Sequence, residues 1–130
     1  MVIDPIADFI NQLKNASAVR KESIDVPYAK FTFAVAQKLE QAGYLKSVTK
    51  RGKKVRKSIK IELQYDKSLP KIQGVERISK PGRRLYERAQ KLRPINFGHG
   101  ALILSTPKGV LTDKEARKEK IGGEALFKIW

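Results

Sequence analysis

The spacing of apolar residues in the first half of the chain predicts two helices separated and followed by strands. Asp4 and Pro5 form an N-cap and a first helical residue, and one apolar face follows at the i, i+3, i+4 and i+7 positions, Ile6, Phe9, Ile10 and Leu13. After a short strand over 23–26, closed by Pro27, a second helix spans 28–42 and buries Phe31, Val35, Ala36, Leu39 and Ala42. Gly43 then suits a left-handed helix end. Strands over 44–48 and 58–65 are joined by a turn at 51–53, and the second strand alternates between apolar and polar residues.

The second half of the chain predicts mostly strands with one short helix. Pro70 and Gly74 interrupt the pattern, so we divide the chain there into subdomains 1–66 and 67–130. Strands are predicted over 75–80, 101–104 and 124–130, with a helical turn and loop over 88–97. Thr112 and Glu115 form a capping box that starts a helix at 113, which runs to about 120 and is ended by Gly122-Gly123. The predicted class is α+β with two small α/β subdomains, α-β-α-β-β in the N-terminal one and mostly β with one short helix in the C-terminal one.

Charge indicates the kind of partner. The 130 residues include 28 Lys and Arg against 13 Asp and Glu, a formal net charge of +15. The positive side chains of such an excess repel one another in a small domain. We therefore expect the protein to bind a polyanion, and nucleic acid is the first candidate. No helix pairs a broad apolar face with a lysine-rich one, so we expect no membrane partner. The absence of cysteine excludes disulfides and thiolate metal sites. With neither a signal-peptide pattern nor a long apolar run, a cytoplasmic location is predicted.

Basic residues form two clusters that we predict to contact phosphates. The segment 46–60 holds eight Lys and Arg and no acidic residue, and its hairpin tip contributes Lys53, Lys54 and Arg56. Such a run is often only a solvated face, but here sequence-independent phosphate contact is the stronger interpretation. The second cluster contains Arg77, Lys80, Arg83 and Arg84 around Pro81-Gly82, followed by Arg88, Lys91 and Arg93, with Tyr86 among them. Tyr86 could stack on a base or sugar, or could be a core residue, and the sequence leaves both open.

The segment from Ser105 to Glu124 combines hydroxyls with glycines. Ser105 and Thr106 precede Pro107, and hydroxyls of this kind match a ribose 2′-OH. Gly109, Gly122 and Gly123 would let the backbone approach a sugar–phosphate edge, unless they only form a turn and a helix cap. Enzymatic patterns fail: Gly98-His99-Gly100 is an isolated GxG, His99 is the only histidine, and Ser105 lies in no GxSxG. We therefore predict a protein that is not an enzyme and needs no cofactor or metal.

Three spaced motifs resemble the ribosomal protein S8 family of the small subunit. They are Asp4–Asp8, Arg77–Tyr86, and the C-terminal set made of Ser105–Asp113, Glu115-Ala116-Arg117 and Ile121–Glu124. The resemblance covers nearly the whole chain and implies two small α/β subdomains. It also implies binding to a helical region in the central domain of small-subunit ribosomal RNA, chiefly through the C-terminal part, early in assembly. In some bacteria a member also represses translation of its own operon mRNA, which is the alternative function.

The resemblance further implies which residues contact RNA. They are Ser105, Thr106, Lys108 and Gly109, with Gly122, Gly123 and Glu124 beside them, flanked by Tyr86, Lys80, Arg83 and Arg84. Neighbouring small-subunit proteins are implied partners, and the free protein is expected to be a monomer. The chain departs from the family at Pro107, where a serine is usual, so one hydroxyl contact is lost and the turn is stiffer. His99 replaces a common aliphatic residue, and the hairpin at 50–57 is unusually basic.

Overall fold

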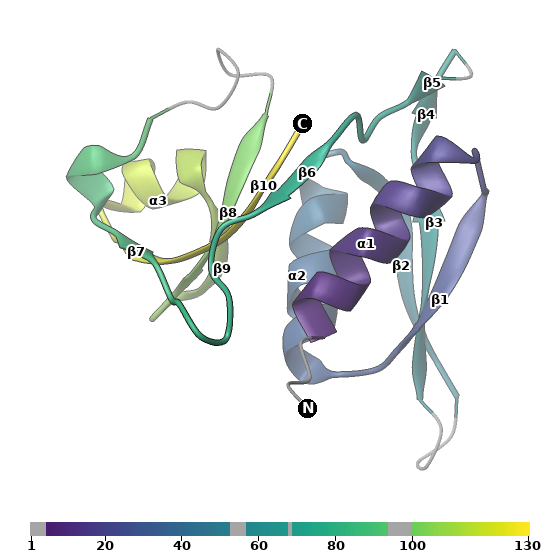
Figure 1. The fold of residues 1–130 in the computed structure, drawn as a ribbon, viewed down its shortest axis with the longest axis horizontal. Coiled ribbons are helices and arrows are strands. Elements are labelled where there is room, and N and C mark those ends of the chain that lie inside the picture. Colours follow the sequence, from purple (N-terminus) through teal and green to yellow (C-terminus); the bar gives the residue numbers. More distant parts are fainter. Residues whose placement is uncertain (1–4, 53–56, 68, 94–99) are drawn as a thin grey trace. The chain divides into compact units, whose positions relative to one another are not determined.

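The fold is α+β, as predicted, and divides into two compact units. The structure is a computed structural model that describes residues 5–52, 57–67, 69–93 and 100–130 (Figure 1). Contacts group the chain into an N-terminal unit, Asp4–Gln73, and a C-terminal unit that contains Gly74–Trp130. Among the described residues, the regular structure of the two units consists mainly of three α-helices and antiparallel strands.

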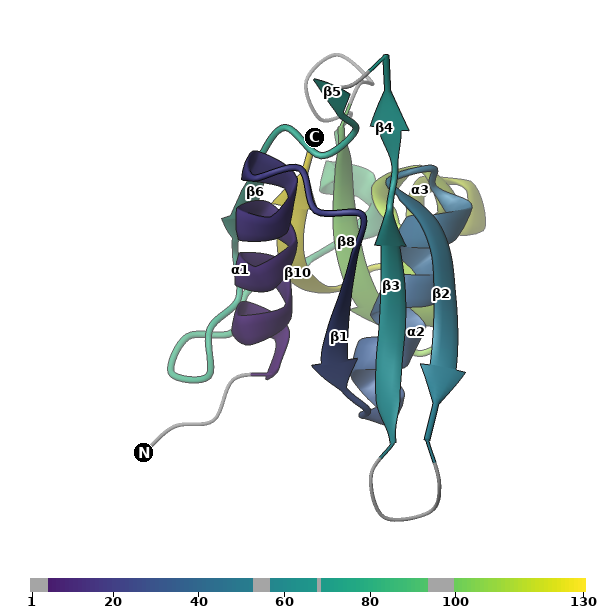
Figure 2. The same cartoon turned by 90° about the vertical axis from the view of Figure 1, so that its right-hand side faces the viewer.

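The N-terminal unit is a three-stranded antiparallel sheet with two helices. In chain order its elements are α1 (Pro5–Ala18), β1 (Ser23–Pro27), α2 (Lys30–Gln41), β2 (Leu45–Arg51) and β3 (Ser58–Leu63). The strand order is β1-β3-β2, so β3 lies in the middle (Figure 2). Ile59, Ile61 and Leu63 of β3 are buried while the residues between them are half-buried. This alternation gives the sheet one apolar face, which requires cover from the helices.

The buried face of α1 is the one that the sequence predicted, whereas the buried face of α2 differs from the prediction. The predicted α1 face, made of Ile6, Phe9, Ile10 and Leu13, is buried. In α2 the buried residues are Thr32, Val35, Ala36 and Leu39. The prediction was wrong for Phe31, which is 42% exposed, and for Ala42, which is exposed at the C-cap. The buried face is rotated relative to the predicted one, because Thr32 points inward in place of Phe31. Thr32 precedes Ala36 by four residues and Leu39 by seven, so the three lie on one side of the helix.

The N-terminal unit continues to Gln73, past the predicted limit at residue 66. A small ladder pairs β4 (Tyr65–Asp66) with β5 (Leu69–Pro70), and the Lys71 N–H donates to the Gln64 carbonyl at 2.9 Å. Ile72 is buried. The Tyr65 hydroxyl donates to the Lys21 carbonyl, and burial raises the pKa of this phenol above its usual value. The ladder, the Lys71 hydrogen bond and the burial of Ile72 attach residues 69–72 to the first unit.

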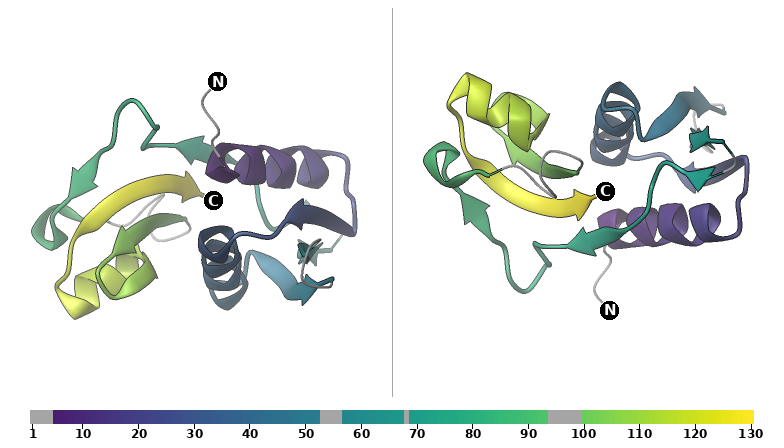
Figure 3. Two further views of the ribbon diagram at one scale, coloured as in Figure 1. Left: turned by 90° about the horizontal axis from the view of Figure 1, so that it is seen from below. Right: turned by 90° about the horizontal axis from the view of Figure 1, so that it is seen from above.

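The C-terminal unit is built around its last strand. Its elements are β6 (Val75–Arg77), β7 (Tyr86–Glu87), the 3₁₀ helix η1 (Ala89–Lys91), β8 (Ala101–Thr106), β9 (Gly109–Thr112), α3 (Asp113–Glu119) and β10 (Gly123–Ile129). The sheet order is β6-β10-β8-β9, and β7 also pairs with β10, the long yellow strand in Figure 3. The predicted capping box at Thr112 and Glu115 starts α3. The short strands β7 and β9 were not predicted.

The core of the C-terminal unit lies between α3 and the sheet. Buried Leu92, Leu102, Leu104, Ala116 and Ala125 pack together there. The predicted buried strand is confirmed in β8, whose first four residues are all buried. Because β8 and β10 are fixed by this packing and by their ladder, the residues at their polar ends are held in defined positions.

Candidate nucleic-acid interface

Three neighbouring strands bring predicted site residues side by side. Glu124 on β10 is paired in register with Tyr86 on β7 and with Ser105 on β8. The ladder order therefore places a phenol, a carboxylate and a hydroxyl in one row across the sheet. This row was not visible in the sequence, because the three residues are far apart along the chain and β7 was not predicted. Tyr86 is 70% exposed, so the alternative that it is a core residue is wrong.

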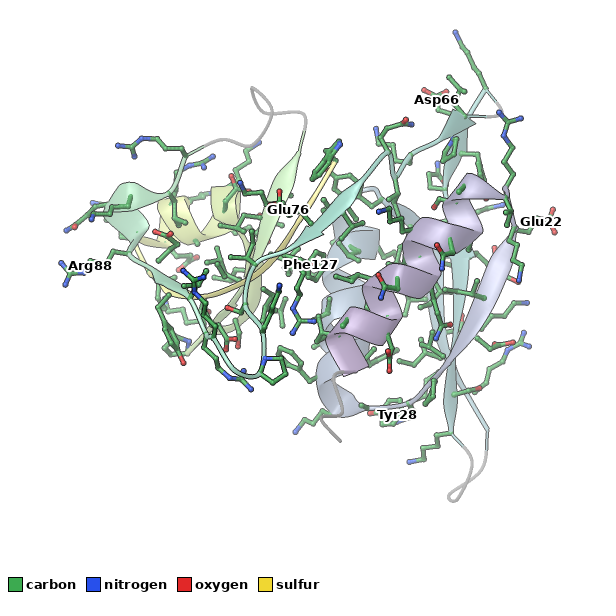
Figure 4. The ribbon with its side chains drawn as sticks, viewed as in Figure 1. Glu22, Tyr28, Asp66, Glu76, Arg88 and Phe127 are labelled. Carbon is green, nitrogen blue, oxygen red and sulfur yellow. The ribbon has the colours of Figure 1, made fainter. Side chains whose placement is uncertain are left out.

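The row lies in a groove of about 920 Å³ in the C-terminal unit. The groove is lined by Tyr86, Glu87, Arg88, Ala89, Gln90, Ser105, Thr106, Pro107, Arg117, Lys120, Gly122, Gly123 and Glu124. The three cations of this lining are Arg88, Arg117 and Lys120. Arg88 belongs to the second basic cluster but was not among the predicted site residues, and Arg117 and Lys120 lie outside both clusters. Arg88 extends outward between β7 and η1 (Figure 4). The basic last turn of α3 was the signal that could have identified Arg117 and Lys120.

Glu124 is one of two carboxylates that line the groove, the other being Glu87, and Arg84 holds it. The Arg84 guanidinium Nη1 lies 3.1 and 3.3 Å from the two carboxylate oxygens. The Glu124 side chain is only 14% exposed, whereas that of Arg84 is 56% exposed. An ionised carboxylate only accepts hydrogen bonds, so this position suits base amino groups or a 2′-OH and repels a phosphate. The pair therefore gives the groove a polar contact that discriminates between ligand groups.

The turn between β8 and β9 uses one of the two predicted hydroxyls for itself. Thr106 Oγ1 donates to the Gly109 carbonyl at 2.7 Å and accepts from the Lys108 N–H at 3.2 Å. Gly109 has φ +109°, a conformation that favours glycine. Ser105 is half-exposed in the groove, and its hydroxyl has no intramolecular partner among the described residues. Ser105 is therefore the hydroxyl that is available to a ligand, and Thr106 maintains the turn.

Gly123 is required by strand packing. A Cβ at this position would lie 2.2 Å from the Ser105 carbonyl oxygen and 3.0 Å from Thr106 Cγ2. Gly122 is similarly close to the backbone at Glu87. The alternative that these glycines cap α3 is wrong, because the C-cap is Lys120 in a left-handed conformation with φ 55°. The glycines let β10 approach its neighbours closely, and this approach shapes the groove.

A buried serine fixes the loop that carries the predicted arginine cluster. The Leu85 N–H donates to Ser79 Oγ at 2.9 Å, and this hydroxyl is 3.2 Å from the Leu85 carbonyl oxygen, which accepts its proton. Within the loop, Lys80 and Arg83 form a backbone bridge with two 2.9 Å hydrogen bonds. We call residues 80–84 the arginine loop. Lys80, Arg83 and Arg84 are exposed on it, and Arg84 reaches Glu124.

Other predicted site residues lie elsewhere. Lys108 is exposed at the turn and pairs with Glu119 at 3.0 Å. Lys53, Lys54 and Arg56, together with His99, lie outside the described residues. Over the described ranges, no group of three His, Cys, Asp or Glu side chains could hold a metal ion. Within the same ranges, no helix has the length and apolar composition needed to cross a bilayer.

The fold and the groove define a class: a basic α+β protein with a surface groove that holds the row of Tyr86, Glu124 and Ser105 and is lined by three cations. Residues 4–130 match the family model described as "Ribosomal protein S8". The chain therefore belongs to the ribosomal protein S8 family, as its motifs indicated. This is a family of ribosomal structural proteins and not of enzymes.

Relatives match the chain over almost its full length. The small ribosomal subunit protein uS8 of Persephonella marina is 43% identical, and the alignment covers 100% of both chains. The uS8 protein of Dictyoglomus thermophilum is 42% identical over 99% of this chain and 98% of its own. That of Mycoplasma mobile is 38% identical over 100% and 98%, respectively. These matches leave no part of either unit outside the family.

Proposed function

We propose that this protein is a structural constituent of the small ribosomal subunit. In this proposal it binds directly to the central domain of the small-subunit ribosomal RNA and helps the subunit assemble. The observation that carries the proposal is the row of Tyr86, Glu124 and Ser105 in a groove bordered by cations. The wide, shallow minor groove of A-form RNA displays 2′-hydroxyls and base edges, which small polar side chains can reach. Family membership and the names of the relatives support the ribosomal setting.

Each of the following predicted site residues, in the groove and outside it, has a proposed contact. The Ser105 hydroxyl exchanges hydrogen bonds with a ribose 2′-OH, and the exposed Tyr86 ring stacks on an unpaired base or a sugar. Glu124 accepts from a donor on the RNA. The arginine loop, Lys108 and the hairpin residues Lys53, Lys54 and Arg56 contact phosphates, which adds affinity without reading sequence.

The first test measures binding to a central-domain RNA helix as a function of salt. If six to ten phosphates are contacted, affinity should fall by about 10³ to 10⁵ between roughly 50 and 200 mM salt, a scale established for duplex DNA. Binding that does not respond to salt would contradict the proposal.

Ser105→Ala tests the specific contact. Loss of one hydrogen bond should weaken binding to the central-domain helix by about three- to tenfold, because such a bond contributes about 0.5–1.5 kcal/mol. Affinity for a random RNA duplex should not change. An RNA with a single 2′-deoxy substitution at the contacted ribose should show the same loss, with no further loss when combined with Ser105→Ala. Ser58→Ala, in the other unit, is the matched control. Equal losses on specific and random RNA would refute the assignment.

The same groove would accept an mRNA helix of the same shape, which is the basis of the alternative role as a translational repressor of its own operon. A gel shift with the operon leader and ribosomal RNA as competitor tests it, and the absence of a specific complex would exclude it. We further propose that the protein acts on cytoplasmic ribosomes beside other small-subunit proteins and is a monomer when free. Co-sedimentation with small subunits and light scattering of the free protein test these two points.

A further inference from the structure

Two lysines of the N-terminal unit converge on one tyrosine ring. Tyr28 lies between β1 and α2, at the end of the sheet where the basic hairpin begins (Figure 4). The Lys50 ammonium on β2 is 4.7 Å from the centroid of the Tyr28 ring, and the Lys57 ammonium, just before β3, is 5.8 Å from it. The Tyr28 N–H donates to the Lys57 carbonyl at 3.1 Å, which fixes the backbone of the two residues together.

The ring explains how both ammonium groups can be held beside the same residue. Ammonium groups repel one another, but the negative face of an aromatic ring attracts each of them within about 6 Å. Among the described residues, neither Lys50 nor Lys57 has a carboxylate within ion-pair distance. Both lysine side chains are exposed. The result is a pair of positioned cations whose charge is not neutralised within the described part of the chain.

The chemistry that completes such a pair is an anion, and the surroundings favour a nucleic-acid phosphate. The segment 46–60 that carries both lysines has no acidic residue, and the chain has a net charge of +15. We propose that Lys50 and Lys57, held against Tyr28, form a clamp for a backbone phosphate of RNA. The N-terminal unit thereby makes an RNA contact of its own. This inference rests on the proposed function, because RNA is the ligand of the clamp only if the protein binds RNA.

The test separates the ring from the charges. Tyr28→Leu removes no charge, yet it should lower RNA affinity about two- to fivefold, because a cation–π contact at an exposed site is of that size. Tyr28→Phe keeps an aromatic face and should bind as the wild type does. The loss should be equal on central-domain and random RNA, because a phosphate carries no sequence information. Unfolding is measured for Tyr28→Leu and Tyr28→Phe. If the two variants are equally stable, a difference in their RNA affinity comes from the aromatic ring and not from damage to the fold.

Substitutions of the lysines keep the test valid if Tyr28→Leu fails to fold. Lys50→Gln and Lys57→Gln should each reduce the slope of log affinity against log salt by about one, whereas Lys14→Gln on α1 controls for the change in net charge. If both lysine variants match Lys14→Gln, or if Tyr28→Leu folds and binds like the wild type, the clamp is refuted. A loss with Ser105→Ala in the same assays would then leave the proposed function standing. If the wild-type chain binds no ribosomal RNA, both proposals fail.

Discussion

Three cations of the C-terminal unit and two cations of the N-terminal unit are held by different kinds of partner. In the C-terminal unit, Arg84, Lys108 and Arg117 each pair with a carboxylate, at 3.1, 3.0 and 2.8 Å. In the N-terminal unit, Lys50 and Lys57 are held by the ring of Tyr28. A carboxylate fixes a cation and also cancels its charge, whereas an aromatic ring fixes it and leaves the charge intact.

This difference suggests a division between recognition and attraction. Paired charges contribute little long-range potential, but they place donors and acceptors in fixed positions, as Arg84 does for Glu124 in the groove. Unpaired cations on a ring act on any polyanion and are sensitive to salt. We therefore expect damage to the C-terminal groove to change selectivity and damage to the N-terminal clamp to change affinity for all RNAs.

The largest expected effect comes from Gly123→Ala. The new Cβ would meet the Ser105 carbonyl oxygen at 2.2 Å, so β10 and β8 must separate. Overpacking of this kind costs about 1–3 kcal/mol of unfolding free energy, which urea denaturation can measure. Because the row of Tyr86, Glu124 and Ser105 depends on the same ladders, specific RNA affinity should fall at least about tenfold, the equivalent of about 1.4 kcal/mol.

Gly82→Ala is the matched control for Gly123→Ala. Gly82 lies in the exposed tip of the arginine loop, and a Cβ there would meet no atom within 4 Å. We expect stability to be unchanged, and RNA affinity to fall far less than with Gly123→Ala, because the loop keeps all its cations. If both alanine variants behave alike, the close approach of β10 to β8 is not what shapes the groove.

A smaller effect is expected from Ser79→Ala. It leaves the Leu85 N–H without its 2.9 Å acceptor at a site where Ser79 is only 1% exposed, at a cost of about 1–3 kcal/mol. The arginine loop should loosen, so that Arg84 no longer holds Glu124 and specific RNA affinity falls. Affinity for a random duplex should fall less, because only the phosphate contacts of the loop are weakened there. Hydrogen exchange at Leu85 and a salt titration check this. Unchanged exchange at Leu85 would mean that Ser79 does not hold the loop.

The elements were predictable where a local pattern determined them. The period of α1, the alternation in β3 and the capping box at Thr112 are each complete within a few neighbouring residues. Phe31 was misplaced because two apolar faces were compatible with the α2 sequence, and tertiary packing selected the one that buries Thr32. The strand β7 has two residues and exists only because β10 pairs with it.

The candidate site was predictable as a set of residues but not as an arrangement. The sequence identified the hydroxyls, glycines and basic residues of the site. It did not show which of them lie next to one another in the folded protein. The row across β7, β10 and β8 depends on ladder register between distant segments, and so does the use of Gly123 for close packing. The Tyr28 clamp was missed for the same reason, since β2 and β3 must pair before Lys50 and Lys57 reach one ring.

The smallest expected effect tests the comparison of the units most directly. Lys108 and Glu119 form an exposed pair at 3.0 Å, with side chains 61% and 48% exposed, and such pairs contribute about 0–1 kcal/mol to stability. Glu119→Gln should therefore leave unfolding unchanged, while it removes the carboxylate that partly neutralises Lys108 and so strengthens the contact of this lysine with phosphates. Affinity for random RNA should rise slightly, by about twofold or less, with a slightly steeper salt dependence. Lys108→Gln combined with Glu119→Gln should abolish this gain, because the released charge is then absent. If Glu119→Gln lowered random-RNA affinity instead, the carboxylate would be contributing to binding and not masking a cation, and the contrast with the unmasked lysines on Tyr28 would fail.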